Sequence, residues 1–127
     1  MSDHDSTTTR FPMLFTGASK AMVAIGLRSA SSFVDVNPQT VTIRMGWAFR
    51  ATLPRSSVTS AAHDHDRVLG WGAHGWGGRW LNNGSSFNIV RIEFEPRGRG
   101  RTAGFPVNVG IVRVSVDEPD ALIAALS

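Results

Sequence analysis

The chain has 127 residues, of which 42% are hydrophobic and 18% are charged, and its formal net charge is +3. This composition is typical of a folded globular protein and excludes a chain that is disordered throughout. The absence of cysteine excludes a disulfide framework, thiolate chemistry and cysteine-based zinc sites. We expect a single domain over residues 11–127, preceded by a polar, disordered N-terminal tail at 1–10.

The sequence favours a cytoplasmic bacterial protein without a membrane span. No run approaches the ~20 apolar residues that cross a bilayer, and residues 1–10 lack the basic and apolar pattern of a signal peptide. Twelve of the thirteen basic residues are arginine. They are scattered along the chain, and together with many Ala, Val and Gly residues they are typical of a GC-rich coding genome.

The N-terminal part of the chain contains two short apolar segments. The run at 11–15 predicts an edge strand or a flap over the core, because Pro12 cannot donate to a strand ladder. Residues 22–27 alternate like a strand, and a short helix over 18–25 is the alternative.

Three strands are expected in the next part of the chain. Apolar residues at 33–36 precede turn residues at 37–39, and residues 41–45 then alternate strictly between apolar and polar side chains. This pattern predicts a hairpin. Gly46-Trp47 marks the next corner, and the alternation at 49–53 predicts the following strand.

Strands and loops continue toward the middle of the chain. Residues 57–61 predict a bent or bulged strand, and 63–66 (His-Asp-His-Asp) a polar loop. Arg79-Trp80 begins a strand that leads to a turn at 82–84, where Asn and Gly tolerate positive φ. The alternation at 90–94 predicts a strand with a charged outer face.

The C-terminal part of the chain changes from strand to helix. Residues 96–101 (Pro-Arg-Gly-Arg-Gly-Arg) are a loop by composition, and 107–116 form a strand whose alternation changes phase beside Gly110, which predicts a bulge or a bend. Asp117 is the expected N-cap of a short amphipathic helix that runs to the terminus. The whole chain therefore predicts a mainly β fold of about seven antiparallel strands with one C-terminal helix.

That order of elements resembles the pleckstrin-homology-like (PH-like) fold, a bent antiparallel β-barrel of seven strands closed at one end by a helix. Phe-Arg-Ala-Thr-Leu-Pro-Arg-Ser-Ser-Val (49–58) and Val-Ser-Val-Asp-Glu-Pro-Asp-Ala-Leu-Ile-Ala-Ala-Leu (114–126) are similar to segments of bacterial, actinobacterial-type PH-like proteins of unknown function. The resemblance spans residues 32–126. It implies binding, scaffolding or assembly without shared catalysis.

The resemblance does not extend to phosphoinositide binding. PH domains that bind phosphoinositides place Lys and Arg around the first hairpin, whereas the corresponding turn here is Asn37-Pro38-Gln39. The flanking Arg28 and Arg44 do not form a basic cluster in the sequence.

The segment 70–80 (Gly-Trp-Gly-Ala-His-Gly-Trp-Gly-Gly-Arg-Trp) is the candidate binding site. It contains three of the four tryptophans and five of the thirteen glycines. Tryptophan and arginine are enriched at interface hot spots, so Trp71, His74, Trp76 and Arg79 are the candidate binding residues. The alternative is that Trp80, and with it Trp76, belongs to the core of a strand.

Two further segments carry ionisable side chains. His63 and His65, with His74, offer metal ligands, but a metal site needs three or four convergent ligands, so a solvated loop is the preferred interpretation and we expect no metal or cofactor. The arginines at 97–101 could contact phosphates, but a solvated hairpin connection is preferred. Because this loop has no aromatic residue for base stacking, the sequence does not favour nucleic acid as a partner.

The sequence contains no spacing typical of a catalytic nucleophile and base, of paired carboxylates or of a phosphate loop. We therefore expect no enzyme. The expected function is a binding or scaffold module that contacts an unidentified protein or peptide through the Trp/Gly segment. The alternative is a small β-barrel that carries an apolar small molecule inside the barrel.

Overall fold

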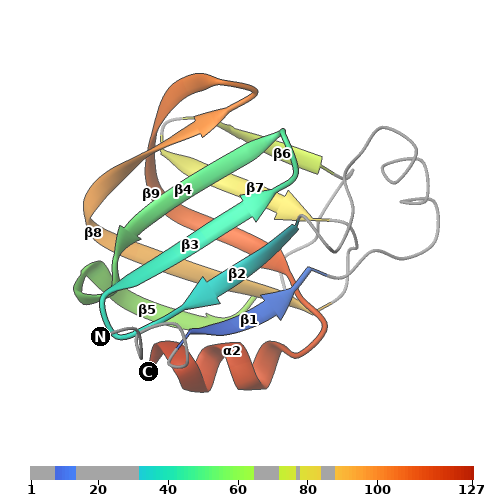
Figure 1. Ribbon diagram of the computed structural model, residues 1–127, viewed down its shortest axis with the longest axis vertical. Helices are drawn as coiled ribbons and strands as arrows, with labels where there is room; N and C mark the ends of the chain where they lie inside the picture. Colours follow the sequence, from blue (N-terminus) through green and yellow to red (C-terminus); the bar gives the residue numbers. More distant parts are fainter. Residues whose placement is uncertain (1–7, 14–31, 65–71, 77, 84–87) are drawn as a thin grey trace.

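The structure, a computed structural model, describes residues 8–13, 32–64, 72–76, 78–83 and 88–127. Most of these residues lie in strands, and one α-helix follows at the C-terminus (Figure 1). The elements are β1 (Thr9–Pro12), β2 (Ser32–Val36), β3 (Thr40–Met45), β4 (Phe49–Pro54), the 3-10 turn η4 (Arg55–Ser57), β5 (Val58–His63), β6 (Gly72–Trp76), β7 (Arg79–Asn83), β8 (Ile89–Thr102), β9 (Phe105–Ser115) and α2 (Pro119–Leu126).

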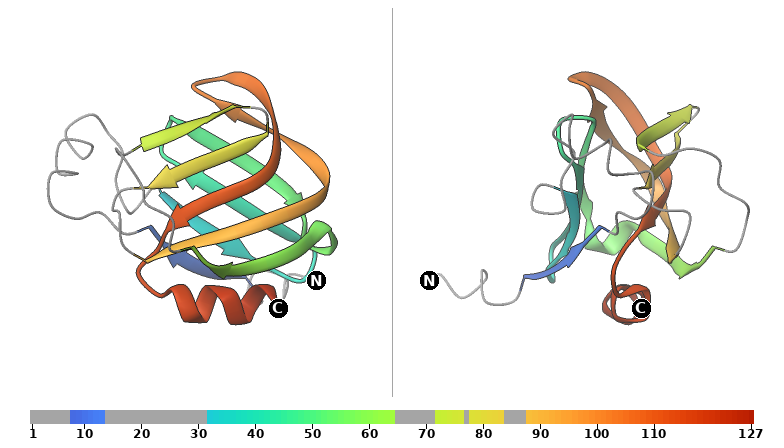
Figure 2. Two further views of the ribbon diagram at one scale, coloured as in Figure 1. Left: turned by 180° about the vertical axis from the view of Figure 1, so that it is seen from behind. Right: turned by 90° about the vertical axis from the view of Figure 1, so that its right-hand side faces the viewer.

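The strands form one bent sheet in the order β1-β2-β3-β4-β8-β9-β7-β6, and β5 pairs with β8 beside this path. The sheet folds over itself, so that β2, β3 and β4 face β7, β8 and β9, with α2 along one end (Figure 2). The long strand β8 joins both halves, because it pairs with β5 through its first half and with β4 through its second half.

The expected mainly β fold with one C-terminal helix is confirmed, but three details of the predicted barrel are wrong: the number of strands, the closure and the purely antiparallel pairing. Nine strands are present in the described part of the chain, and no ladder between them closes the sheet into a barrel. An isolated bridge between Met13 and Val116, with a hydrogen bond from the N–H of Asp117 to the carbonyl oxygen of Pro12 (3.1 Å), links the end of β1 to the chain after β9. The sheet is also not purely antiparallel, because β7 and β9 run parallel.

The alternation of apolar and polar residues explains the strands that the sequence predicted well. In β3 and β4 every second side chain is buried, and the others face outward. The outward Thr42 and Thr52 place their Oγ1 atoms 3.1 Å apart across the two strands. Such a period of two is the pattern of a sheet with one face on the core.

The predicted loop at 96–101 is wrong, because these residues continue β8. The glycines of this segment face inward, where space is lacking: a Cβ at Gly98 would lie 2.4 Å from Leu53 Cδ2, and one at Gly100 would lie 2.8 Å from the carbonyl oxygen of Arg50. Arginines alternate with these glycines and are exposed. The glycines therefore allow β8 to approach β4 closely.

The core fills the space between the two halves of the sheet. Phe49 of β4 and Trp80 of β7 meet there with ring centroids 5.3 Å apart. Leu122 and Leu126 of α2 are buried against the same core, as the predicted amphipathic helix requires. The N-cap of α2 is Glu118, not the predicted Asp117, and no side chain caps the helix by a hydrogen bond.

Several predicted features lie outside the described residues: the strand or helix within 18–27, His65, Trp71 and the glycine of the turn at 82–84. At the N-terminus, β1 begins at Thr9 and therefore includes the last two residues of the predicted tail. His63 ends β5 instead of beginning a loop. Within the described chain, no helix is both long enough and apolar enough to cross a membrane.

Candidate functional site

The Trp/Gly segment forms a hairpin of β6 and β7. His74 and Trp76 lie in β6, for which the structure describes the backbone, and Arg79 begins β7 with an exposed side chain. Trp71 lies outside the described residues. Trp80 is buried in the core, with 7% of its surface exposed, so the alternative interpretation of this tryptophan is confirmed.

Strand β9 anchors one side of this hairpin. The carbonyl oxygen of Gly78 accepts hydrogen bonds from the N–H groups of Gly110 (2.7 Å) and Ile111 (3.0 Å). The parallel register of β7 on β9, with Arg79 opposite Ile111, continues this pairing. The hairpin is therefore attached to the sheet through β7.

The other side of the hairpin is the edge of the sheet. Among the described strands, β6 pairs with β7 alone. Trp76 pairs with Arg79, which leaves a two-residue connection, and the closing pair of such a hairpin exchanges hydrogen bonds. Because backbone groups alternate in direction along a strand, the N–H groups of Ala73 and Gly75 point away from β7.

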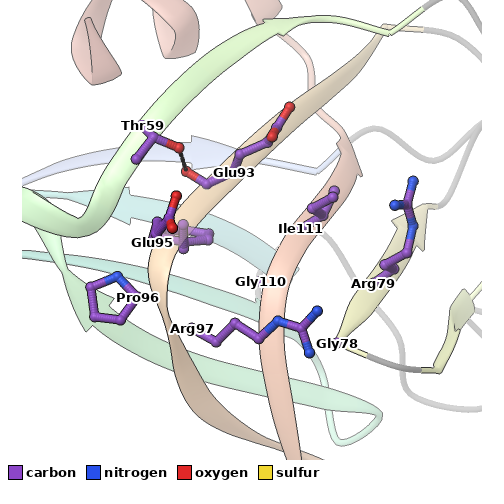
Figure 3. Close-up of a pocket in the computed structure, with 10 residues that line it drawn as sticks. Thr59, Gly78, Arg79, Glu93, Glu95, Pro96, Arg97, Gly110 and Ile111 are labelled. Atoms are coloured by element: carbon purple, nitrogen blue, oxygen red, sulfur yellow. Dashed lines mark hydrogen bonds between the residues drawn. The ribbon is translucent and has the colours of Figure 1, made fainter.

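A surface hollow of about 390 Å³ lies beside the hairpin (Figure 3). Its wall on β8 is an irregular segment, because the register between β8 and β9 shifts between Glu93 and Gly98. The predicted phase change beside Gly110 lies opposite this shift, so the predicted irregularity is confirmed. The lining residues are Thr59, Gly78, Arg79, Glu93, Phe94, Glu95, Pro96, Arg97, Gly110 and Ile111.

Two glycines make room for the side chain of Arg97 at this hollow. A Cβ at Gly78 would lie 3.1 Å from Arg97 Nη1, and one at Gly110 would lie 3.0 Å from Arg97 Cγ. The side chain extends from β8 toward Gly78 in Figure 3. The positive φ of Gly78 (81°) is a second reason for glycine at this position.

The hollow presents both signs of charge. Glu93 and Glu95 contribute carboxylates, and Arg79 and Arg97 contribute guanidinium groups. Glu93 also forms a half-exposed ion pair with Arg91 on β8 (Nε to Oε2, 3.1 Å). Such a surface can orient polar or charged groups of a ligand by hydrogen bonds and ion pairs.

Of the three histidines considered as metal ligands, the structure describes only the side chain of His63. His63 Nε2 lies 2.6 Å from Asp120 Oδ1 of α2, which links the end of β5 to the helix. His65 is not described. No group of three or more His, Asp and Glu side chains that could hold a metal ion is present in the described ranges.

Sequence reasoning found Arg79 of this hollow but missed its other charged residues. Glu93 and Glu95 were assigned only to the outer face of a strand, and Arg97 to a loop. The phase change beside Gly110 is the signal that could have found them, because an irregular strand often re-aims side chains next to a site.

The chain was compared with protein-family models, curated proteins and solved structures, and none of them matches.

Proposed function

We propose that this protein is a non-catalytic binding module that takes up an extended peptide of a partner protein along the edge of β6. The observation that carries the proposal is the position of β6 at the end of the sheet, paired with β7 alone in the described chain. A strand edge presents N–H and C=O groups that an added strand can pair with, as in β-augmentation.

The composition of β6 supports this use. Natural sheet edges are usually guarded by Lys, Pro or other charged residues that prevent pairing with further strands. The sequence of β6, Gly-Ala-His-Gly-Trp, contains no Lys, Pro or carboxylate. The strand at the opposite end of the sheet, β1, contains both Arg10 and Pro12. These two ends of the strand path therefore differ in the way expected if β6, and not β1, accepts a strand. Strand β5 also pairs with one described strand only, β8, but α2 packs beside it.

The hollow beside the hairpin supplies a second element of recognition. A peptide that pairs with β6 gains affinity through its backbone, while specificity needs side-chain pockets nearby. Arg79 connects the two features, because it follows the hairpin turn and lines the hollow. The proposed partner segment therefore carries polar or charged side chains that fit a surface of mixed charge.

The PH-like relationship, a bacterial source and a cytoplasmic location are part of this proposal. The antiparallel meander of β2, β3 and β4 and the packing of α2 against the sheet agree with a PH-like module. A carrier of apolar molecules has less support, because large side chains such as Phe49, Met45 and Trp80 fill the space between the two halves of the sheet.

Hydrogen exchange of the free protein is the first test. The outward N–H groups of Ala73 and Gly75 should exchange faster than that of His74, which bonds β7. Peptides of about ten residues selected from a random phage library should then slow the hydrogen exchange of these two amides, because each amide would donate to the bound peptide strand. Protection of both amides before any peptide is added would show that the edge is already covered.

Variants at Ala73 test the backbone contact. Ala73→Pro removes one outward N–H and should weaken peptide binding about tenfold, while proline on an edge strand leaves the fold intact. Ala73→Ser keeps the N–H and should bind like the parent protein. The proposal fails if the proline variant binds normally, or if the selected peptides shift NMR signals elsewhere and leave β6 unchanged.

A further inference from the structure

Three arginines form a row across adjacent strands on the outer face of the sheet. Arg44 of β3 is the register partner of Arg50 of β4, and Arg50 is in turn the partner of Arg101 of β8. Arg99 lies two residues before Arg101 on the same exposed face. We call Arg44, Arg50, Arg99 and Arg101 the arginine face.

The arginine face is not neutralised by carboxylates in the described chain. The four arginines form no ion pair with a described Asp or Glu. The sequence has no acidic residue at 36–63 or 96–116, the segments that build this region. Like charges directly opposite each other on neighbouring strands are destabilising. A row of three such charges is therefore a feature that folding alone does not explain.

Three residues of the arginine face, Arg50, Arg99 and Arg101, line an open hollow of about 540 Å³. This size falls within the range of ligand pockets. Three guanidinium-bearing residues and one hydroxyl-bearing residue contribute to a single concave surface. The lining residues are Arg50, Ala51, Thr52, Arg99, Gly100, Arg101 and Pro106.

Two exposed aromatic residues lie at the turns at one end of this region. Trp47 (58% exposed) is in the turn between β3 and β4, and Phe105 (72% exposed) follows the turn between β8 and β9. The two turns are joined, because the N–H of Ala103 and the hydroxyl of Thr102 both donate to the carbonyl oxygen of Ala48 (3.1 and 2.8 Å).

Arginines of the face contact both turns. Arg44 Nε donates to the carbonyl oxygen of Gly46 (3.4 Å), next to Trp47, and Arg101 Nη1 donates to that of Gly104 (3.2 Å), next to Phe105. Trp47 is therefore next to the arginine face. Phe105 is the register partner of Thr102, which alternates with Arg101 along β8, so Phe105 belongs to the opposite face of the sheet. The sequence alone did not favour nucleic acid because the 97–101 segment lacks aromatic residues, but the fold brings Trp47 beside it.

We propose that the arginine face, with Trp47, binds single-stranded nucleic acid, independently of the peptide edge at β6. Arginine binds phosphate in bidentate geometry, and aromatic rings stack on unpaired bases. In a duplex the bases are stacked on each other and are not available to these rings. The neighbouring Trp47 favours a phosphate that carries a base over an anionic membrane, whose surface attracts Lys and Arg clusters of any geometry.

Fluorescence anisotropy with a labelled oligodeoxythymidine of about 15 nucleotides tests this proposal on the full chain. If three or four phosphates are contacted, log K should fall against log salt concentration with a slope of about −2 to −3. Arg50→Gln removes one contact and should reduce the slope by about 0.7. Arg79→Gln removes one positive charge from the hollow beside the β6–β7 hairpin, away from the arginine face, and should leave the slope unchanged.

The aromatic contribution is tested with Trp47→Ser, and Phe105→Ser, on the opposite face of the sheet, is the matched control. Trp47→Ser should bind the oligonucleotide about tenfold more weakly, because stacking contributes substantially per base, whereas Phe105→Ser should bind it as the parent protein does. Both variants should bind inorganic polyphosphate, which has no bases, as the parent protein does. Circular dichroism checks that each variant keeps its fold, and all affinities are measured on folded protein.

Four results would overturn the proposal. The first two are a lack of oligonucleotide binding at about 50 mM salt, and a loss of affinity for the oligonucleotide that is equal in Arg50→Gln and Arg79→Gln. The other two are an affinity that Trp47→Ser leaves unchanged, and a preference for a duplex of the same length. Binding to vesicles containing about one-third phosphatidylglycerol, without binding to the oligonucleotide, would assign the face to a membrane surface instead. None of these results bears on the peptide edge, which is tested by Ala73→Pro.

Discussion

Trp80 donates its indole N–H to the backbone carbonyl oxygen of Asn108 across a distance of 2.9 Å. This bond joins β7 to β9 at a point where the ring of Trp80 also packs on Phe49 of β4. This buried tryptophan of the Trp/Gly segment therefore connects the candidate site to both halves of the sheet. Its role is to hold the hairpin in place.

Variants of Trp80 separate the hydrogen bond from the packing. Trp80→Phe keeps an aromatic ring but loses the donor, and it should lower the free energy of unfolding by about 1 kcal/mol. Trp80→Ala also leaves a cavity and should lower it by about 3–5 kcal/mol. Urea denaturation followed by circular dichroism measures both values. Equal losses for the two variants would mean that the ring makes no separate contribution.

Glycine and arginine have different roles in the 97–101 segment. Gly100→Ala should lower the free energy of unfolding by about 1–3 kcal/mol, because the new Cβ would lie 2.8 Å from the carbonyl oxygen of Arg50 and 2.9 Å from Ala51 Cβ. Arg99→Ala, one residue away, is exposed and should change it by less than about 0.5 kcal/mol. Chemical denaturation measures both values.

The comparison of Gly100→Ala with Arg99→Ala also tests the proposal for the arginine face. If the arginines served the fold, Arg99→Ala would destabilise the protein as much as Gly100→Ala does. A stable Arg99→Ala protein agrees with an arginine that faces outward toward a ligand. A stable Gly100→Ala protein would contradict the close approach of β8 to β4.

The sequence predicted the strands that have one buried face, and it failed where contacts between distant segments decide the structure. The strict alternation at 41–45 and 90–94 is a local signal, and both segments are strands. The 97–101 segment has the same period of two, but its apolar positions are glycines, which composition assigns to a loop. The need for glycine comes from Leu53 and Arg50, about 50 residues away.

The same reason explains what the sequence missed at the candidate sites. The predicted Trp/Gly segment is a hairpin, but its attachment through parallel pairing with β9 has no local signature. Arg50 and Arg101 are register partners although they are far apart in the chain. A basic cluster of this kind becomes visible only when the strand order is known.

The C-terminal helix depends on its packing against the sheet. A helix of eight residues is not stable alone in water, so α2 needs its buried leucines. Replacing Leu122, which is fully buried, by Ala should lower the free energy of unfolding by about 2–5 kcal/mol. Ala121→Ser changes an exposed residue of the same helix and should lower it by no more than about 0.5 kcal/mol. Thermal denaturation measures both, and equal midpoints would mean that the helix does not stabilise the fold.

Two Arg–Asp pairs differ in burial and should differ in their contribution to stability. Asp64 and Arg113 are 2.6 Å apart, with 5% and 23% of their side chains exposed, whereas Asp35 and Arg10 are 2.8 Å apart, with 17% and 55% exposed. Removing one partner of a buried pair leaves a charge without its counter-ion, which is more costly than losing a surface pair.

Asp64→Asn should therefore lower the free energy of unfolding by about 2–3 kcal/mol, less than for a fully buried pair because Arg113 keeps some contact with water. Asp35→Asn should lower it by no more than about 1 kcal/mol. Hydrogen bonds to Asp35 raise the pKa of Arg10, but arginine stays charged wherever the protein is folded, so this shift adds no pH dependence near neutrality.

Urea denaturation of both variants at low and high salt compares the contributions of the two ion pairs to stability. The salt sensitivity should be greater for the Asp35 pair, since exposed charges are screened more strongly. A larger loss for Asp35→Asn than for Asp64→Asn would show that burial does not set the strength of these pairs.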